Sequence, residues 1–272
     1  MNNNAHAPIG LFDSGIGGLT VANAITAQLP NESLIYFGDT AHLPYGDKSA
    51  DTIRYFTKTI GSFLLSKECK ILVIACNTAS SVAFEMLENM AGDKAYVFNV
   101  IDAVVDEIIR KKYKKVGVIG TLGTINSNAY KSKINVKDAS VDVRQLATPL
   151  LAPMIESGFV DGQISHLVIE EYLNSPELQD IDTLILACTH YPLIKKEIED
   201  YYAQKNKKVD VLATNEIVAI HIKKFMIEHG LVNYEKKGKN AFYVSDYTES
   251  FEKTTQLFYK ESIDLIHLPL FK

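Results

Sequence analysis

The stretch KILVIACNTAS, residues 70–80, decides the fold because it has a near copy later in the chain, TLILACTHYP at residues 183–192. In each stretch, an apolar run of strand length that is rich in β-branched residues ends at a cysteine and then turns polar. This pattern predicts that Cys76 and Cys188 each lie at the carboxyl end of a buried strand, beside the N-terminus of the next helix. Two thiols placed in this way could face one substrate.

The similarity between the two parts of the chain extends upstream of the cysteines. IGLFDS at residues 9–14 aligns with VGVIGT at residues 116–121, so that Ser14 falls on Thr121. Each half therefore carries a hydroxyl residue and then a thiol at nearly equal spacing. Because this period is far longer than the roughly 20 to 50 residues of a solenoid repeat, we interpret it as an internal duplication.

The rest of the chain alternates predicted strands with predicted helices, which is typical of parallel sheets covered by helices on both faces. Strands are predicted at residues 8–12, 33–37, 71–75, 95–100, 115–119, 141–146, 182–187, 208–212, 241–245 and 264–268. Helices are predicted at residues 15–29, 49–67, 78–90, 102–112, 126–133, 150–157, 161–174, 192–204, 214–229 and 247–259.

We therefore predict an α/β fold of two pseudo-symmetric, doubly wound domains with the active site in the cleft between them. The first domain is expected to comprise residues 1–98 and 210–272, and the second residues 99–209. The final segment is assigned to the first domain because it is too short to form a third one. Ligands of such sheets bind beyond the carboxyl ends of the strands.

Composition excludes several classes of function. The 272 residues are 47% hydrophobic and carry a net charge of −5, which argues against nucleic acid as the main partner. The basic run Arg110 to Lys115 is interpreted as a solvated helix end, with a polyanion-binding patch as the alternative. No apolar stretch reaches the roughly 18 residues of a membrane span, and the N-terminus does not resemble a signal peptide. We therefore expect a cytoplasmic protein whose three cysteines are reduced thiols.

The residues around the two thiols indicate acid–base chemistry on a small anion. A thiol acts as a base only as the thiolate, which a helix N-terminus or a cation favours. Asn77 and Thr78 follow Cys76, and Thr189 follows Cys188, so that side chains and backbone N–H groups could bind a carboxylate.

Each thiol has a candidate proton partner. His190 lies two residues after Cys188, and imidazole suits proton transfer near neutral pH. Asp13 begins the turn DSGIGG beside Cys76, and a role as N-cap of the following helix is an equal alternative. The glycines of this turn lack the spacing of a dinucleotide fingerprint. No CxxC or HExxH pattern occurs, so we expect no metal.

Two further stretches are less decisive when considered alone. GDTAHLPYG at residues 38–46 is predicted to be a loop, in which Tyr45 and Gly46 could touch a ligand. Glu156 by itself is interpreted as a carboxylate on a helix surface.

Four motifs together carry a family resemblance. DSGIGG at residues 13–18, GDTAHLPYG at 38–46, ACNTAS at 75–80 and ACTHYP at 187–192 resemble those of the bacterial glutamate racemases, in the aspartate/glutamate racemase superfamily. They occur in the family's order and spacing, and the resemblance extends over the whole length. The segment VDVLATNEIVA at residues 209–219 matches only loosely, and we expect it to line the domain junction.

The resemblance implies a racemase that needs no cofactor and interconverts L-glutamate and D-glutamate, the D-isomer being used for peptidoglycan and hence cell shape. It implies two bases: Cys76 deprotonates D-glutamate and Cys188 deprotonates L-glutamate. Asp13 assists the first and His190 the second, and Glu156 matches a further assisting glutamate. The substrate contacts of the family fall on Asp13, Ser14, Tyr45, Gly46, Asn77, Thr78, Thr121, Thr189 and His190.

The resemblance also implies a homodimer, and three alternatives stay open. An aspartate racemase belongs to the same superfamily. A redox enzyme would also use two cysteines, but it would need their Cα atoms within about 4.4 to 6.8 Å. Some glutamate racemases also inhibit DNA gyrase, although nothing in this sequence indicates that binding role.

Overall fold

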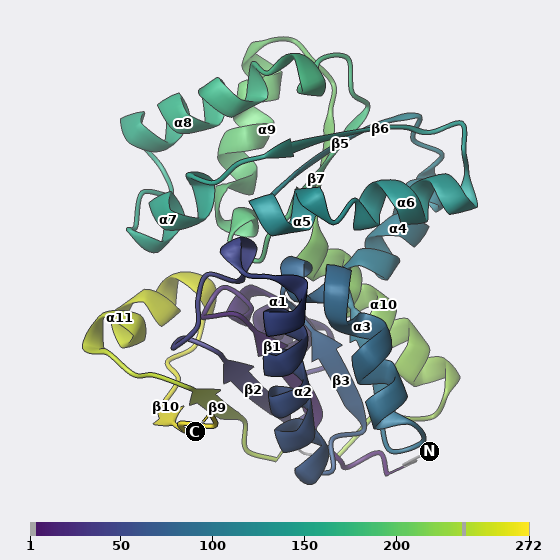
Figure 1. Ribbon diagram of the computed structural model, residues 1–272, viewed down its shortest axis with the longest axis vertical. Coiled ribbons are helices and arrows are strands. Elements are labelled where there is room, and N and C mark those ends of the chain that lie inside the picture. The colour runs from purple at the N-terminus through teal and green to yellow at the C-terminus, as the bar shows by residue number, and fades with distance from the viewer. Residues whose placement is uncertain (1–3, 236–237, 272) are drawn as a thin grey trace.

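In the computed structural model, which describes residues 4–235 and 238–271, two parallel sheets lie in two domains arranged one above the other (Figure 1). Helices cover the sheets, so the α/β architecture predicted from the alternating pattern is confirmed. No helix among the described residues is long and apolar enough to cross a membrane.

The first sheet contains strands from both ends of the chain. Its order is β10-β9-β2-β1-β3-β4, and every neighbouring pair is parallel. The strands are β1 (Ile9–Asp13), β2 (Leu34–Gly38), β3 (Ile71–Ile74), β4 (Tyr96–Asn99), β9 (Ala241–Val244) and β10 (Leu265–His267). The predicted return of the C-terminal segment to the first sheet is thus observed for β9 and β10.

The second sheet repeats part of the first. Its order is β6-β5-β7-β8, formed by β5 (Lys115–Gly120), β6 (Asp142–Ala147), β7 (Thr183–Ala187) and β8 (Asp210–Ala213). Counted from each domain's first strand, this is the same order as β2-β1-β3-β4. The strand before each cysteine is therefore an inner strand of its sheet. It lies next to the strand that the aligned hydroxyl residue follows, which supports the internal duplication.

One expected domain boundary is wrong by one strand. The division at 209/210 would assign residues 210–213 to the first domain, but they form β8 and pair with β7, Asp210 lying opposite Thr183. The reason is the repeat itself: β8 occupies the position in the second sheet that β4 occupies in the first. The other division, at 98/99, falls one residue before β4 ends.

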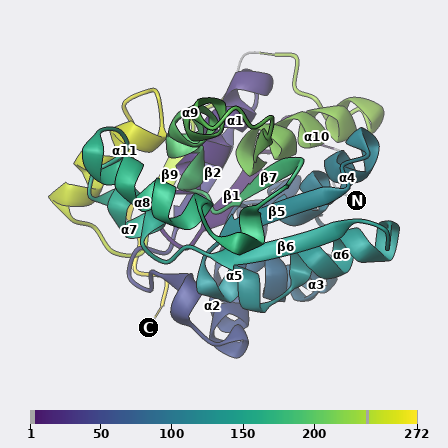
Figure 2. The ribbon, with the colours of Figure 1, turned by 90° about the horizontal axis from the view of Figure 1, so that it is seen from above.

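Helices cover both faces of each sheet (Figures 1 and 2). The first domain carries α1 (Leu19–Gln28), α2 (Ala50–Ser66), α3 (Asn77–Ala91) and α11 (Glu249–Phe258). The second carries α5 (Leu122–Asn126), α6 (Ala129–Lys137), α7 (Leu151–Glu156), α8 (Gln163–Leu173) and α9 (Lys195–Gln204). Short 3₁₀ turns form at η1 (Tyr45–Asp47), η2 (Pro176–Leu178) and η3 (Tyr191–Ile194).

The central strands are buried on both faces, which explains their unbroken apolar runs. Leu11 and Val73 belong to one core cluster with residues of α1, whereas Phe12 and Ile74 belong to a second cluster with residues of α2 and α3. All four side chains are fully buried. Each such side chain contributes about 1.5–3 kcal/mol relative to an exposed one, so the strands that hold the cysteines are anchored from both sides.

Two helices cross between the domains. α4 (Val100–Lys111) follows β4 of the first sheet but bonds to α6 of the second domain, where Lys133 Nζ lies 2.6 Å from Asp102 Oδ1. α10 (Thr214–Glu228) follows β8 of the second sheet but packs on α1 of the first domain, and Asn215 Nδ2 donates to Thr20 O at 3.4 Å. The loosely matching segment 209–219 therefore lies at the domain junction, as expected.

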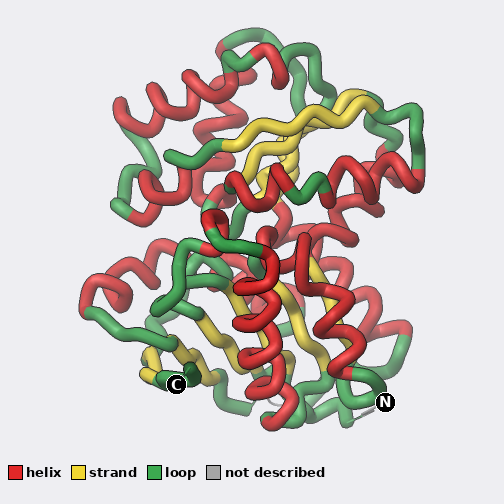
Figure 3. The backbone as a smooth tube through the Cα atoms, in the orientation of Figure 1, coloured by secondary structure: helices red, strands yellow, loops and turns green. Residues whose placement is uncertain are grey.

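Two predicted helices have different bounds. Instead of one helix at 126–133, the chain forms α5 and α6, separated at Asn128, whose φ of 55° is left-handed. Instead of a helix that begins at residue 192, the 3₁₀ turn η3 comes first and α9 begins at Lys195. The tube in Figure 3 shows these short helical pieces next to the strand ends.

Candidate active site

A cavity of about 200 Å³ lies between the two domains, where the carboxyl ends of the central strands of both sheets meet. It contains both predicted cysteines. Its lining also includes every other predicted site residue except Asp13. The cavity is lined by Ser14, Gly15, Leu43, Pro44, Tyr45, Gly46, Cys76, Asn77, Thr78, Thr121, Ala152, Pro153, Glu156, Ala187, Cys188, Thr189 and His190.

Cys76 caps the N-terminus of α3. Its sulfur accepts from the backbone N–H of Ala79 at 3.5 Å, and its thiol donates to Ser14 Oγ at 3.7 Å. Burial raises the pKa of Cys76 to about 12 and the negative charge of Asp13 acts in the same direction, whereas Ala79 and Ser14 act to lower it. Burial therefore favours the neutral thiol of Cys76.

Cys188 stands beside a buried imidazole. Its sulfur lies 3.6 Å from Nδ1 of His190, and Nε2 of the same ring lies 2.8 Å from Oε1 of Glu156, which ends α7. Burial acts to lower the pKa of His190, but the contacts with Cys188 and Glu156 outweigh it and raise that pKa to about 10. A protonated His190 can balance a negative charge on the Cys188 sulfur.

Asp13 lies behind the cavity rather than in its wall. It is fully buried, and its Oδ2 accepts from the N–H groups of Gly18 at 2.8 Å and Gly15 at 3.3 Å. Its Oδ1 has no hydrogen-bond partner among the described residues. Burial raises the pKa of Asp13, whereas the charge of His190 and the backbone donors lower it. The carboxylate therefore stabilises the turn before α1 and acts on Cys76 through its charge.

Gly17, in the same turn, permits a close approach between the domains. A Cβ atom at Gly17 would lie 2.5 Å from Cε1 of His190 and 2.6 Å from Oγ1 of Thr189. Glycine is needed at this position because the turn packs directly against the residues that follow Cys188.

Tyr45 and Gly46 bring the loop at 38–46 to the cavity. Tyr45 is almost fully buried, and its hydroxyl donates to Oδ2 of Asp39 at 2.7 Å. A Cβ atom at Gly46 would lie 2.9 Å from Cβ of Thr121 in the other domain. The loop reaches the second domain because glycine leaves room for that contact.

Hydroxyl and amide groups connect the two domains at the same place. Oγ1 of Thr78 lies 2.9 Å from that of Thr121 and 3.0 Å from that of Thr124. The hydroxyl of Tyr130 donates to Oδ1 of Asn77 at 2.7 Å. Thr78 and Asn77 come from the first domain, whereas their partners come from the second.

Sequence reasoning missed three of the residues that support this wall: Asp39, Thr124 and Tyr130. Asp39 lies within the motif at residues 38–46, and Thr124 lies three residues after Thr121. The carboxyl group of the first and the hydroxyl group of the second could therefore have been considered. Tyr130 gives no such signal, because it is an isolated aromatic residue in a short helix outside the four motifs.

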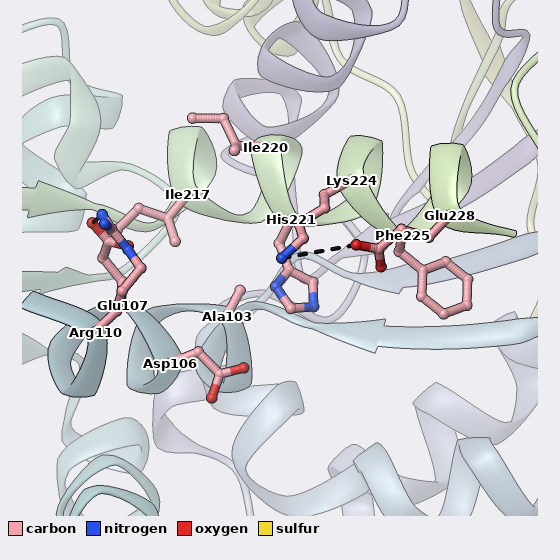
Figure 4. A pocket seen from close by; sticks show the side chains of 10 residues that line it. All are labelled: Ala103, Asp106, Glu107, Arg110, Ile217, Ile220, His221, Lys224, Phe225 and Glu228. Carbon is pink, nitrogen blue, oxygen red and sulfur yellow. Dashed lines mark hydrogen bonds and ion pairs between the residues drawn. The ribbon is translucent and has the colours of Figure 1, made fainter.

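A second cavity, of about 430 Å³, lies between α4 and α10 and contains no cysteine (Figure 4). Two ion pairs lie within its lining: Arg110 Nε donates to Glu107 at 2.8 Å, and Lys224 Nζ lies 3.8 Å from Glu228 Oε1. Asp106, which also lines it, pairs with Lys137. Although this cavity is larger, its lining contains none of the predicted site residues.

No group of three or more His, Cys, Asp or Glu side chains that could hold a metal ion occurs within residues 4–235 and 238–271. The three cysteines are free. Cys76 and Cys188 both line the cavity, and thiols can exchange protons with a small guest.

Comparison with known proteins identifies the family of the chain. Residues 18–222 match the family model Asp/Glu/Hydantoin racemase. The glutamate racemase of Chlorobaculum parvum is 41% identical over 254 residues, which cover 93% of this chain and 92% of that protein.

Solved structures give the same result. The glutamate racemase of Francisella tularensis, solved in complex with D-glutamate, superposes with a TM-score of 0.90 at 38% identity and covers 98% of each chain. A glutamate racemase isoform from Bacillus anthracis also has a TM-score of 0.90, at 33% identity, and covers 98% of this chain and 99% of its own. The two-domain fold around the cavity is thus that of these enzymes.

Proposed function

The chain belongs to the Asp/Glu/Hydantoin racemase family and is a racemase, and we propose that it interconverts L-glutamate and D-glutamate with two cysteine bases. One observation carries the proposal: Cys76 and Cys188 follow equivalent strands of the two sheets and line the same cavity. The D-glutamate bound by the Francisella tularensis enzyme supports glutamate as the substrate.

The reaction needs a base on one face of the α-carbon and an acid on the other. A thiolate at Cys188 removes the α-proton of L-glutamate, and the electrons of the broken C–H bond stay on the substrate as a carbanion. The thiol of Cys76 then gives its proton to the opposite face, which forms D-glutamate and leaves a thiolate at Cys76. The reverse reaction begins with that thiolate, so protons and charge balance in both directions.

The charges around the cavity suit this division. The pKa of His190 is raised to about 10, so this ring carries a positive charge at neutral pH, 3.6 Å from the Cys188 sulfur. Cys76 stays a thiol because of its burial and the charge of Asp13. The cation beside Cys188 supports its proposed role as the base towards L-glutamate, and each turnover moves the negative charge to the other sulfur.

The α-proton of an amino acid is a very weak acid, so the carbanion must be stabilised. Hydroxyl and amide groups of Ser14, Asn77, Thr78, Thr121 and Thr189 surround the cavity and can bind the two carboxylates of glutamate. By analogy with oxyanion holes, one well-placed donor contributes about 3 kcal/mol to the transition state. Holding the substrate between two sulfurs provides the proximity that the proton transfers need.

The product has a cellular use that fits the same proposal. D-glutamate made by this enzyme would supply peptidoglycan synthesis and so maintain cell shape, in the cytoplasm, where free cysteines stay reduced. We also propose a homodimer, with no cofactor, nucleic acid or membrane as partner.

The test is optical activity. Purified protein is mixed with L-glutamate, D-glutamate, L-aspartate or D-aspartate without added cofactor, and circular dichroism is followed over time. Loss of signal with both glutamates and not with the aspartates supports the proposal. Loss with aspartate alone would make the enzyme an aspartate racemase, and no loss with any of the four would refute the proposed activity.

A further inference from the structure

The side-chain amide of Asn77 is held on only one side. Asn77 is the first residue of α3, directly after Cys76, and it is 2% exposed. Its Oδ1 accepts the hydroxyl proton of Tyr130 at 2.7 Å, whereas its Nδ2 is buried and has no hydrogen-bond partner among the described residues. A buried donor without an acceptor costs free energy, so Nδ2 of Asn77 is suited to an acceptor on a bound ligand.

Tyr130 fixes which way this amide faces. Its side chain is fully buried in the second domain, on α6, and burial raises the pKa of its hydroxyl, so the group keeps its proton. A hydroxyl that donates to Asn77 requires the amide oxygen on its side. If the amide turned over, its oxygen would take the place of the Nδ2 donor and would repel a carboxylate in the cavity that Asn77 lines.

We propose that Tyr130 is a positioning residue: it orients the Asn77 amide from the other domain so that Nδ2 donates to a carboxylate of the bound amino acid. The inference rests on the proposed racemase activity and adds to it a residue outside the cavity wall. It also gives the bond between the domains a function, because the donor next to Cys76 has its correct orientation only when α6 lies against α3.

The test is Tyr130→Phe, which keeps the ring and removes the hydroxyl. We expect the KM for both glutamate enantiomers to rise by about tenfold while kcat changes less than about threefold, because a contact made equally to substrate and transition state is lost. The matched control is Tyr202→Phe, a buried tyrosine of α9 whose hydroxyl has no partner among the described residues. Its KM should not change.

A double-mutant cycle separates orientation from general packing. In an Asn77→Ala background, removing the Tyr130 hydroxyl should add no further increase in KM, because there is no amide left to orient. An unchanged KM in Tyr130→Phe, or a loss that is the same in both backgrounds, would overturn the inference. If the wild-type protein did not racemise glutamate, the proposed function itself would fail, which is a different result from an active enzyme that tolerates Tyr130→Phe.

A measurement on the wild-type protein covers the case in which Tyr130→Phe does not fold. The side-chain amide protons of Asn77, assigned by NMR, should shift when D-glutamate saturates the protein. Unchanged resonances at saturation would show that Nδ2 does not meet the substrate and would overturn the inference.

Discussion

The two cysteines occupy equivalent backbone positions but different electrostatic surroundings. Cys76 caps a long α-helix, and its burial and the charge of Asp13 raise its pKa more than the hydroxyl of Ser14 and the N–H of Ala79 lower it. Cys188 precedes a 3₁₀ turn and lies against an imidazole whose pKa its own sulfur and Glu156 together raise to about 10. The backbone of the repeat thus places two sulfurs symmetrically, whereas the side chains around them assign a resting proton to one and a counter-charge to the other.

This difference also explains how nearly mirror-related substrates can share one cavity. In the proposed two-base reaction, the positions of the two sulfurs must be symmetric, because the proton leaves and arrives at opposite faces of one carbon. The side chains around the sulfurs can differ, because only one sulfur has to carry the negative charge at a time.

The largest effect should come from removing either sulfur. Cys76→Ala and Cys188→Ala should each lower the racemisation rate roughly 10³-fold or more, since each removes one of the two proton-transfer groups. Polarimetry with either glutamate enantiomer measures the rate. Cys69→Ala is the matched control, because Cys69 is a buried free cysteine that does not line the cavity, and it should keep its activity. A single-cysteine variant with near wild-type activity would refute the two-base mechanism.

The second largest effect should distinguish the surroundings of Cys188 from those of Cys76. His190→Asn removes the cation beside Cys188, and we expect kcat/KM to fall roughly 10²-fold. The fall must be equal in both directions, because the two enantiomers have equal free energy in water. The difference should be visible in the primary isotope effect, which should increase for α-deuterated L-glutamate more than for α-deuterated D-glutamate. The opposite pattern would assign the bases the other way round.

A smaller effect concerns pH. The folded-state pKa of His190, about 10, lies above its ordinary value, so its contribution to the free energy of unfolding is complete below pH 6.5 and is lost as the pH rises towards 10. Glu156→Gln removes one cause of the raised pKa, so this loss should be smaller and should be complete at a lower pH. Urea unfolding between pH 6 and 10 tests it.

The matched control for that experiment is Glu170→Gln, which removes the exposed partner of Lys205. Its pH dependence should follow the wild type. If Glu156→Gln also followed the wild type, then Glu156 would not be what keeps His190 protonated.

The smallest effect should come from Ser14→Ala. The hydroxyl of Ser14 lies 3.7 Å from the Cys76 sulfur, and by donating to the thiolate it acts to lower the pKa of Cys76, so its removal should raise that pKa further. We expect kcat to fall by about threefold to tenfold. The measurement is the pH–rate profile, whose alkaline limb should move to higher pH. If the rate did not depend on this hydroxyl, the hydrogen bond from the Ala79 N–H would be enough to set the pKa of Cys76.

Much of this site could be predicted because it lies at strand ends. Apolar runs and the polar residues after them gave the positions of Cys76, Cys188, Ser14 and Thr121, since parallel strands bring their carboxyl ends to one edge. The resemblance added Glu156, which reasoning from the residues alone had placed on a helix surface. The role of β8 was missed because a short strand near a domain boundary does not encode which sheet it joins.

The sequence by itself determined the alternation of strands and helices, the duplication and the two thiols, because these depend on local periodicity and on order along the chain. The tertiary structure decided which distant groups meet: Thr78 with Thr121 and Asn77 with Tyr130 across the domain junction, and His190 with Glu156 within the second domain. The physical reason is that burial and contact set the charge of each group. Both arise only when segments far apart in the chain pack together, so the proton on Cys76 and the charge beside Cys188 are properties of the folded molecule.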